Sequence, residues 1–294
     1  MPPLVSIYIP VYNCQEFLAK TFDSVLAQTV ADWECIVVDD ASTDGSWAVA
    51  EAYAKKDARF KLFQIAKEDK RPFPYVRNVA LSHTTGKWIA PLDSDDWWDD
   101  NKLQMQLDAL AAKPKSVWSY HGVRMMRDGK VLAEALSHDP QFALPSQLLL
   151  SNNIIHSSTM IDRQTLMAMD GYTLDMYRAQ DWDLWVRLVM KFGQDGVVSL
   201  PDILGTYRVH TTNISTNHKI ITACERKLIR RVCVNQGLML RKPILAMKMV
   251  DAQILRELDR HAKNGRRGRA KMTALLAALM RPDRMWRWKR LREI

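Results

Sequence analysis

The first hundred residues alternate between short apolar runs and segments with helical periodicity, and this alternation limits the possible folds. The apolar runs cover residues 5–9, 34–38, 60–65 and 88–92, and each has the length of a strand. Apolar positions between residues 18 and 26 follow helical spacing, and Asn13 with Glu16 three residues later predicts a helix start of the capping-box type. The pattern predicts right-handed βαβ units, hence an α/β fold with a mostly parallel sheet flanked by helices.

The last of these runs, Trp88 to Leu92, leads directly into a cluster of carboxylates. Asp93, Asp95 and Asp96 place three acidic side chains within four positions. Carboxylates at the end of a buried strand repel one another unless a cation joins them. Asp93 and Asp95 face the same side of an extended chain, about 7 Å apart, so we expect them to converge on a divalent cation that also holds phosphate oxygens. A solvated acidic turn that caps the following helix, near Asp99, remains the alternative.

Polar residues follow two other predicted strands in the same way. Ligands of open α/β sheets bind at the carboxyl ends of the strands. We therefore expect residues 10–13, Asp39-Asp40 and residues 93–96 to meet in one crevice, although Asp39-Asp40 alone could also be a helix cap. The chain contains neither G-x-x-x-x-G-K-[ST] nor G-x-G-x-x-G, so a diphosphate would have to be held by a metal ion and side chains.

Three features of the second half bear on the fold and the site. Asp128-Gly129, between two β-rich runs, predicts a hairpin and hence antiparallel strands in the sheet. Residues 180–188 fit a helix with Asp181 in its first turn, where an acidic residue also suits the helix dipole. Residues 204–210 predict a strand that ends near His210.

Composition bounds the class of protein. The chain has 294 residues, 47% hydrophobic and 26% charged, which is typical of a globular protein with a full core. No stretch approaches the roughly 18 apolar residues of a membrane span, and the N-terminus does not resemble a signal peptide. We therefore expect a cytoplasmic protein whose four cysteines are reduced and do not form a zinc site.

The positive net charge belongs to the C-terminal quarter. Residues 219–294 contain 21 Lys and Arg but 6 Asp and Glu, a charge of +15, whereas residues 1–218 carry −6. We expect a domain boundary near His218, followed by a basic helical extension. In the tail, Trp286 and Trp288 alternate with basic residues, a pattern that suits an anionic membrane surface, a phosphate-bearing acceptor or nucleic acid. A helical cap packed on the rest of the protein remains the alternative.

Six motifs, taken together and in order, resemble the inverting glycosyltransferases of family 2, which have the GT-A nucleotide-sugar fold. The motifs are V-S-I-Y-I-P-V-Y-N at 5–13, V-V-D-D-A-S-T-D-G-S at 37–46, Arg77-Asn78, L-D-S-D-D-W at 92–97, Q-D-W-D-L-W-V-R-L at 180–188 and Y-R-V-H at 207–210. The resemblance implies a GT-A domain at residues 1–218. It also implies transfer of a sugar, with inversion, from a nucleoside diphosphate, most simply a UDP-sugar, to an acceptor hydroxyl in cell-surface polysaccharide or glycolipid synthesis.

The resemblance also implies roles for individual residues. It assigns Pro10, Tyr12, Asp39, Arg77, Asp93 and Ser94 to the nucleotide sugar, Asp95 and His210 to a Mn²⁺ or Mg²⁺ ion or the diphosphate, and Asp181 to the general base. Within this set, Asp93 would face either the ribose or the metal. The family commonly has Glu before the catalytic Asp, and here Gln180 takes its place. We expect this change to leave Asp181 easier to ionise and to alter contacts with the acceptor.

The partners that follow are a glycan or lipid-linked acceptor and, through the tail, the inner face of an anionic membrane, whereas nucleic acid is not expected. Two other classes remain open. A nucleotidyltransferase would share the acidic metal site but should carry a triphosphate loop rich in glycine and lysine, which is absent near the N-terminus. A catalytically silent binding module would account for the basic tail, but it would not need both Asp95 and Asp181.

Overall fold

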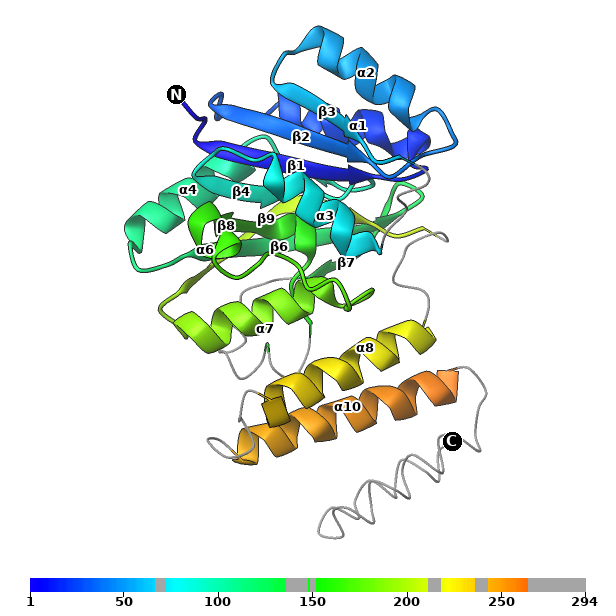
Figure 1. Ribbon diagram of the computed structural model, residues 1–294, viewed down its shortest axis with the longest axis vertical. Coiled ribbons are helices and arrows are strands. Elements are labelled where there is room, and N and C mark those ends of the chain that lie inside the picture. Colours follow the sequence, from blue (N-terminus) through cyan, green and yellow to red (C-terminus); the bar gives the residue numbers. More distant parts are fainter. Residues whose placement is uncertain (67–71, 136–147, 149–151, 211–217, 236–242, 264–294) are drawn as a thin grey trace. The chain divides into compact units, whose positions relative to one another are not determined.

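The computed structural model describes residues 1–66, 72–135, 148, 152–210, 218–235 and 243–263 (Figure 1). The chain divides into two compact units. The first comprises Met1–Leu148 and Asn152–Asn213, and the second comprises Leu149–Ser151 and Ile214–Ile294.

The first unit begins with the predicted alternation of strands and helices. The elements are β1 Val5–Val11, α1 Gln15–Leu26, β2 Trp33–Asp39, α2 Ser46–Lys56, β3 Phe60–Gln64, α3 Phe73–Ser82 and β4 Trp88–Pro91. All four predicted strands are present, each within a few residues of its expected bounds. β1 and β2 are buried along their whole length, which explains why their sequences are continuous apolar runs.

One sheet of nine strands forms the centre of the described part of this unit, in the order β3-β2-β1-β4-β8-β6-β9-β5, with β7 paired to β6. The remaining strands are β5 Trp97–Trp98, β6 Trp118–Arg127, β7 Lys130–Ala135, β8 Thr159–Asp162 and β9 Val197–Arg208. The α/β class is confirmed. The sheet is mixed rather than mostly parallel, because β3, β2, β1 and β4 run parallel while β8 pairs antiparallel with both β4 and β6.

The predicted hairpin is the connection between β6 and β7. Asp128 and Gly129 adopt positive φ angles of 49° and 76°, as a two-residue type I′ turn requires. Beyond β6, η2 His156–Ser158, a short 3₁₀ helix, leads into β8, and the following helices are α6 Arg163–Met167 and α7 Gln180–Phe192. The helix expected after the carboxylate cluster is α4 Lys102–Ala112.

The predicted capping box at Asn13 is wrong. Helix α1 begins at Gln15 with Cys14 as its N-cap, and no side chain caps it. Asn13 instead has a φ of 47° and its Oδ1 accepts a hydrogen bond from the backbone N–H of Thr43, at 2.8 Å. A contact thirty residues away therefore uses the side chain that the local motif assigned to the helix.

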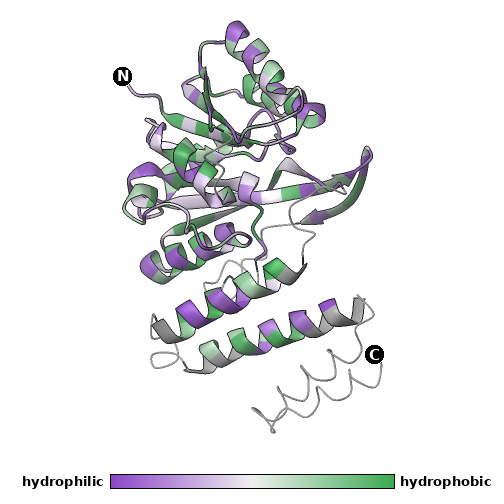
Figure 2. Ribbon diagram, turned by 45° about the vertical axis from the view of Figure 1, so that its right-hand side comes forward, coloured by the Kyte–Doolittle hydropathy of each residue, from purple (hydrophilic) through white to green (hydrophobic). Residues whose placement is uncertain are grey.

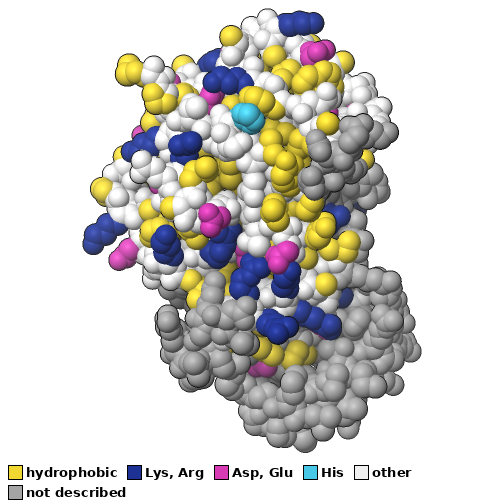
Figure 3. Space-filling model, viewed as in Figure 1, with side chains coloured by type: hydrophobic (Ala, Val, Ile, Leu, Met, Phe, Trp, Pro, Cys, Tyr) yellow, Lys and Arg dark blue, Asp and Glu magenta, His cyan; other side chains and the backbone are white. Residues whose placement is uncertain are grey.

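Helices cover both faces of the sheet. One core joins Val5, Ile7 and Ile9 of β1 to residues of α1, α2 and α4, and the other joins Tyr8 to residues of α3, α6 and α7. Successive residues of β1 thus face opposite helix layers, as the two-residue repeat of a strand requires. On the surface, Figure 3 shows hydrophobic side chains gathered near the middle of one face, among charged side chains.

The described part of the second unit contains α8 His218–Arg230, the π-helix η4 Arg231–Asn235 and α10 Pro243–Lys263. Hydrophobic and hydrophilic residues alternate along α8 and α10 (Figure 2). The helices are joined by Arg226, whose Nε donates to Glu257 at 2.7 Å, and by an ion pair between Arg260 and Glu225. Both tail tryptophans, Trp286 and Trp288, lie outside the described residues. Within the described part of the chain, no helix is both long and apolar enough to cross a membrane.

Candidate active site

The candidate site lies where the parallel strands end. Val11, the last residue of β1, pairs with Asp39, the last residue of β2, and Tyr8 pairs with Pro91 at the end of β4. The backbone N–H of Leu92 also bonds to the Tyr8 carbonyl at 3.0 Å. The residues that follow β1, β2 and β4 are therefore neighbours, and the three polar clusters meet as the sequence predicted.

Asp39 is completely buried, and only one of its carboxylate oxygens accepts hydrogen bonds from the described residues. Its Oδ2 accepts hydrogen bonds from the Gln64 side chain and the Ser42 backbone, at 3.0 and 3.1 Å. Its Oδ1 has no hydrogen-bond partner among the described residues, which leaves a buried acceptor for a ligand. The alternative that Asp39 caps α2 is wrong, because the N-cap is Gly45 and no side chain caps that helix. Nearby, Pro10 is buried in β1, whereas Tyr12 is 45% exposed.

Asp93 is held by two basic groups. Its Oδ1 lies 2.8 Å from Arg77 Nη2 and 3.3 Å from His156 Nδ1. Burial alone would raise the pKa of the Asp93 carboxyl, but the Arg77 and His156 contacts outweigh burial and hold it well below its usual range. Arg77 is only 3% exposed, and its Nε and Nη1 have no hydrogen-bond partner among the described residues. The guanidinium therefore retains two donors for a ligand.

Asp95 and Asp96 have different environments. Asp95 Oδ2 lies 2.8 Å from His210 Nε2, and burial together with the charge of Asp93 raises the pKa of the Asp95 carboxyl. Asp96 is 1% exposed and accepts hydrogen bonds from the Ser157 hydroxyl and the Arg208 backbone. Burial and the two neighbouring carboxylates raise its pKa well above normal. These environments exclude a solvated acidic turn, and α4 has no side-chain cap.

A tilted ring contact with Phe17 holds His210 beside Asp95. The imidazole packs on the Phe17 ring with centroids 4.8 Å apart. The Arg208 guanidinium lies over both Phe17 and Trp97, at 4.7 and 4.6 Å, and its Nε donates to the Asp95 backbone carbonyl at 3.0 Å. Helix α1, β5 and the end of β9 thus fix the Asp95–His210 pair.

The Asp95–His210 pair is the candidate site for a divalent metal ion. No group of three or more His, Cys, Asp or Glu side chains suited to a metal occurs in the described part of the chain. A carboxylate oxygen and an imidazole nitrogen are nevertheless ligands that Mn²⁺ accepts, and a dication would relieve the repulsion that raises the pKa of Asp95. The pair fits a metal whose remaining ligands come from phosphate and water.

Asp181 lies in the first turn of α7, as predicted. Its Oδ2 accepts a hydrogen bond from the Asn152 amide at 2.9 Å. Burial and the charge of Arg77 lower the pKa of His156, and the charge of Asp181 opposes that fall; Asp181 also contributes to the raised pKa of Arg77. Asp181 therefore lies within electrostatic reach of the groups that hold Asp93. Asp183, the next carboxylate of α7, is fully buried and accepts hydrogen bonds from Thr173 and Arg187, so it serves the packing of α7.

Gln180, the residue that departs from the family pattern, is 6% exposed. Its side-chain amide faces the backbone carbonyls of Met176 and Tyr177, at 3.3 and 3.2 Å. An amide can donate to these oxygens, whereas a Glu carboxylate would be repelled by them. The residue before α7, Ala179, has a φ of 65°, a conformation that costs a non-glycine residue about 1 kcal/mol or more.

Sequence reasoning missed a buried polar network beneath Asp93. The Tyr8 hydroxyl donates to the Tyr172 hydroxyl at 2.7 Å, and Tyr172 lies 2.7 Å from His156 Nε2. The Asn78 side chain holds the Tyr172 backbone, accepting from its N–H and donating to its carbonyl at 2.8 Å each. The Arg77-Asn78 motif was the one signal for this network in the sequence, because His156 lies in a short 3₁₀ helix that has no periodicity.

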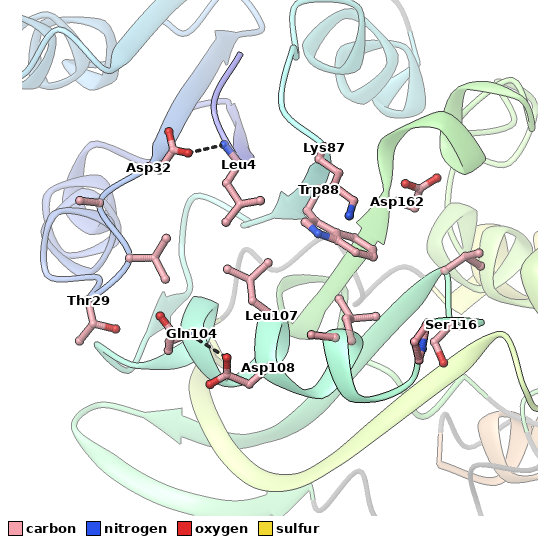
Figure 4. Close-up of a pocket in the computed structure, with 16 residues that line it drawn as sticks. Leu4, Thr29, Asp32, Lys87, Trp88, Gln104, Leu107, Asp108, Ser116 and Asp162 are labelled. Carbon is pink, nitrogen blue, oxygen red and sulfur yellow. Dashed lines mark hydrogen bonds between the residues drawn. The ribbon is translucent and has the colours of Figure 1, made fainter. Parts of the chain in front are cut away.

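A cavity of about 880 Å³ lies at the opposite ends of the strands (Figure 4). Leu4, Asp32 and Lys87, which precede β1, β2 and β4, line it together with Leu107 of α4. Because the candidate site is at the carboxyl ends, this cavity is not part of it.

The parallel half-sheet, extended by antiparallel strands and covered by helices on both faces, has the GT-A fold. Two solved structures share the fold. S. aureus TarS 1–349 in complex with UDP-GlcNAc has a TM-score of 0.64 and 20% identity, covering 80% of this chain and 67% of that one. Mannosyltransferase PcManGT from Pyrobaculum calidifontis, in complex with GDP-Man and Mn²⁺, has a TM-score of 0.60 and 20% identity, covering 97% of this chain and 83% of that one.

Sequence comparison gives the family. The model of glycosyl transferase family 2 matches residues 6–168. The putative teichuronic acid biosynthesis glycosyltransferase TuaG of Bacillus subtilis is 33% identical, over 73% of this chain and 82% of its own length. The glucosyltransferase WfgD of Escherichia coli, named for a UDP-Glc donor and a GlcNAc-diphosphoundecaprenol acceptor, is 29% identical over 73% of this chain and 80% of its own length. The chain belongs to glycosyl transferase family 2 and is a glycosyltransferase, which confirms the predicted family, fold and enzyme class.

Proposed function

We propose that this glycosyltransferase moves a sugar, with inversion, from a nucleoside diphosphate to an acceptor hydroxyl. The donor that we favour is a UDP-sugar. The observation that carries the proposal is that carboxylates from two different elements act on the same two basic side chains. Asp93 and Asp95 follow β4, and Asp181 on α7 acts electrostatically on Arg77 and His156, the same groups that hold Asp93.

Asp181 is the proposed general base. A sugar hydroxyl is a weak nucleophile, so a carboxylate must accept its proton as its oxygen attacks the anomeric carbon and the bond to the diphosphate oxygen breaks. Such a base contributes on the order of 10²–10⁴-fold. The hydrogen bond from Asn152 to Oδ2 supports this role, since it orients the carboxylate and leaves Oδ1 for the acceptor. Base and leaving group act on opposite faces of the sugar, which gives inversion.

The donor's nucleotide is proposed to lie along the ends of β1, β2 and β4. Asp39, whose Oδ1 has no hydrogen-bond partner among the described residues, is proposed to bind the nucleobase, beside Pro10 and Tyr12. Arg77 offers two buried donor atoms without a hydrogen-bond partner among the described residues. Asp93, through Oδ2, and Ser94 are proposed to contact the ribose and the sugar diphosphate, since Asp93 Oδ1 already faces Arg77 and His156.

Asp95 and His210 are the proposed protein ligands of Mn²⁺ or Mg²⁺, supported by their 2.8 Å separation. When bound, such an ion supplies Lewis-acid stabilisation of the leaving diphosphate. The nitrogen ligand favours Mn²⁺ over Mg²⁺, which prefers oxygen. The Mn²⁺ in the PcManGT complex supports the same choice of metal.

The acceptor is proposed to be a glycan or a lipid-linked sugar of cell-surface polysaccharide or glycolipid synthesis. The names of TuaG and WfgD support this class of substrate. We further propose that residues 1–218 form the catalytic domain, and that the basic residues 219–294 bring a cytoplasmic enzyme to the inner face of the membrane, where such acceptors are found.

A donor screen tests the proposal. The purified full chain is incubated with UDP-, GDP- and dTDP-sugars, with and without Mn²⁺, and melting temperature and release of nucleoside diphosphate are measured. We expect a UDP-sugar to stabilise the protein and to release UDP slowly in a Mn²⁺-dependent way. Pyrophosphate release from a nucleoside triphosphate and a sugar phosphate would instead indicate a nucleotidyltransferase. Binding without turnover, with every acceptor tried, would indicate a silent binding module.

A further inference from the structure

Two large apolar side chains are exposed just before the helix that carries Asp181. Leu174 is 48% exposed and Tyr177 is 53% exposed, and both belong to the loop between α6 and α7. Neither side chain has a role in the proposed donor site, metal site or proton transfer. Exposed apolar side chains beside a catalytic group mark a surface where a ligand binds.

The loop is held against the start of α7. The side-chain amide of Gln180 faces the Tyr177 backbone carbonyl at 3.2 Å, and Asp181 is the next residue. The Thr173 hydroxyl donates to Asp183, two residues beyond Asp181, at 2.6 Å. The start of α7 lies on the same side of the first unit as the carboxyl ends of β1 and β2 (Figure 1). These contacts keep Tyr177 beside the proposed general base.

Buried contacts fix the shape of the loop. Met176, between the two exposed residues, is completely buried, and its backbone N–H bonds to the Thr173 carbonyl at 3.1 Å. Asp170 and Ala179, near the two ends of the loop, have positive φ angles of 57° and 65°. Residues other than glycine keep this conformation only where the surrounding structure imposes it. The exposed side chains are therefore presented in a defined position.

The chemistry at Asp181 indicates which ligand suits this surface. A general base takes a proton from a hydroxyl of the acceptor, so the acceptor must place that hydroxyl at the carboxylate. A pyranose ring carries C–H groups on its faces and hydroxyls at its edge. An aromatic ring that packs on the C–H face buries apolar surface on both partners and leaves the hydroxyl edge free. The tyrosine hydroxyl can remain in water.

We propose that Tyr177 packs on the pyranose ring of the acceptor sugar, with Leu174 beside it, and turns a ring hydroxyl toward Asp181. The inference rests on the proposed function, because it takes Asp181 as the general base. Gln180 has a positioning role in it. Its amide holds the backbone of Tyr177, whereas a Glu carboxylate would be repelled by the same carbonyl oxygen.

Transfer to two probe acceptors tests the proposal. The probes are GlcNAc joined through a diphosphate to a short alkyl chain and GlcNAc joined through a diphosphate to a polyprenyl chain, used with Mn²⁺ and the UDP-sugar that the donor screen selects. Tyr177→Ala and Tyr177→Leu should raise the acceptor KM about 10-fold with both probes, because neither keeps the aromatic face. Tyr177→Phe keeps that face and should stay within about 2-fold of wild type.

The donor site should not respond to these substitutions. The donor KM and the hydrolysis of the UDP-sugar without acceptor should stay within about 2-fold of wild type in all three variants. Met190→Ala is the matched control, because Met190 is 36% exposed on the same helix, nine residues after Asp181, which is about 13 Å along the helix axis. It should leave both KM values unchanged. Gln180→Glu should raise the acceptor KM about 3-fold or more with the donor KM unchanged.

The outcomes separate this inference from the proposed function. Wild type that releases no UDP from any UDP-sugar overturns both. Wild type that hydrolyses a UDP-sugar but transfers to neither probe overturns the acceptor assigned to this surface, and so does a wild-type acceptor KM in Tyr177→Ala. A loss confined to the polyprenyl probe assigns Tyr177 to the lipid chain and overturns the contact with the sugar. Equal rises in donor and acceptor KM that follow a lower melting temperature also overturn it, because a purely structural role predicts that result.

Discussion

Asp95→Asn is the substitution that most directly separates metal binding from folding. Asp95 provides one of the two proposed ligands, with 22% of its side chain exposed and His210 Nε2 at 2.8 Å. Asp95→Asn removes one of the two protein ligands and the only carboxylate charge assigned to the metal, so we expect Mn²⁺-dependent UDP affinity to fall about 100-fold, which is about 2.7 kcal/mol.

The fold should survive this change. The pKa of Asp95 is raised by burial and by Asp93, so its ionised form destabilises the metal-free protein at neutral pH. Asp95→Asn removes that charge and should leave the melting temperature equal to or above that of metal-free wild type. Asp100→Asn, the same charge change at an exposed position, is the matched control. Calorimetry with UDP in the presence and absence of Mn²⁺ decides the question, and wild-type affinity in the Asp95 variant would refute the metal assignment.

Three further predictions concern stability and the tail. The pKa of Glu34 is lowered to about 2 because hydrogen bonds from Lys61, Ser6 and Thr85 outweigh burial. The ionised carboxylate therefore contributes up to about 3 kcal/mol to the free energy of unfolding above about pH 4.5, and this contribution is lost as pH falls toward 2. In urea unfolding across that range, the stability of Glu34→Gln should depend less on pH than that of wild type. Gly171→Ala should lower the unfolding free energy by more than about 1 kcal/mol, measured in the same way, because of its φ of 59° and the contact with Asn78. The full chain should sediment with anionic liposomes at low salt and a chain ending at His218 should not; both remaining in the supernatant, or equal binding to neutral vesicles, would favour a packed cap or an oligomer contact.

The sequence predicted the parts of the fold that depend on local pattern. β1, β2 and β4 are mostly apolar because they are buried along their whole length, whereas β3 is only partly buried, and the type I′ turn at Asp128-Gly129 requires the residues found there. The strand-end rule then brought Asp39 and the Asp93–Asp96 cluster together without any knowledge of their side-chain contacts.

The rest depends on contacts between residues far apart in the chain. Tyr8 bonds to a residue 164 positions away and His156 to one 16 positions away, and no local periodicity signals either pair. The predicted capping box at Asn13 was wrong for the same reason, because its side chain accepts a hydrogen bond from the backbone N–H of Thr43, thirty residues away. The share of antiparallel pairing in the sheet was underestimated because β8, a strand of four residues, follows a 3₁₀ helix and its sequence shows little strand periodicity.

Single-turnover transfer by the Asp181→Asn variant decides whether Asp181 is the general base. With a UDP-sugar, Mn²⁺ and an acceptor that wild type uses, we expect the rate of sugar transfer to fall about 100-fold or more, a barrier increase of at least about 2.7 kcal/mol. Donor affinity should change little, because the hydrogen bond that Asp181 accepts comes from Asn152 rather than from the groups assigned to the nucleotide. Transfer at the wild-type rate would show that Asp181 is not the general base and that another group takes the acceptor's proton.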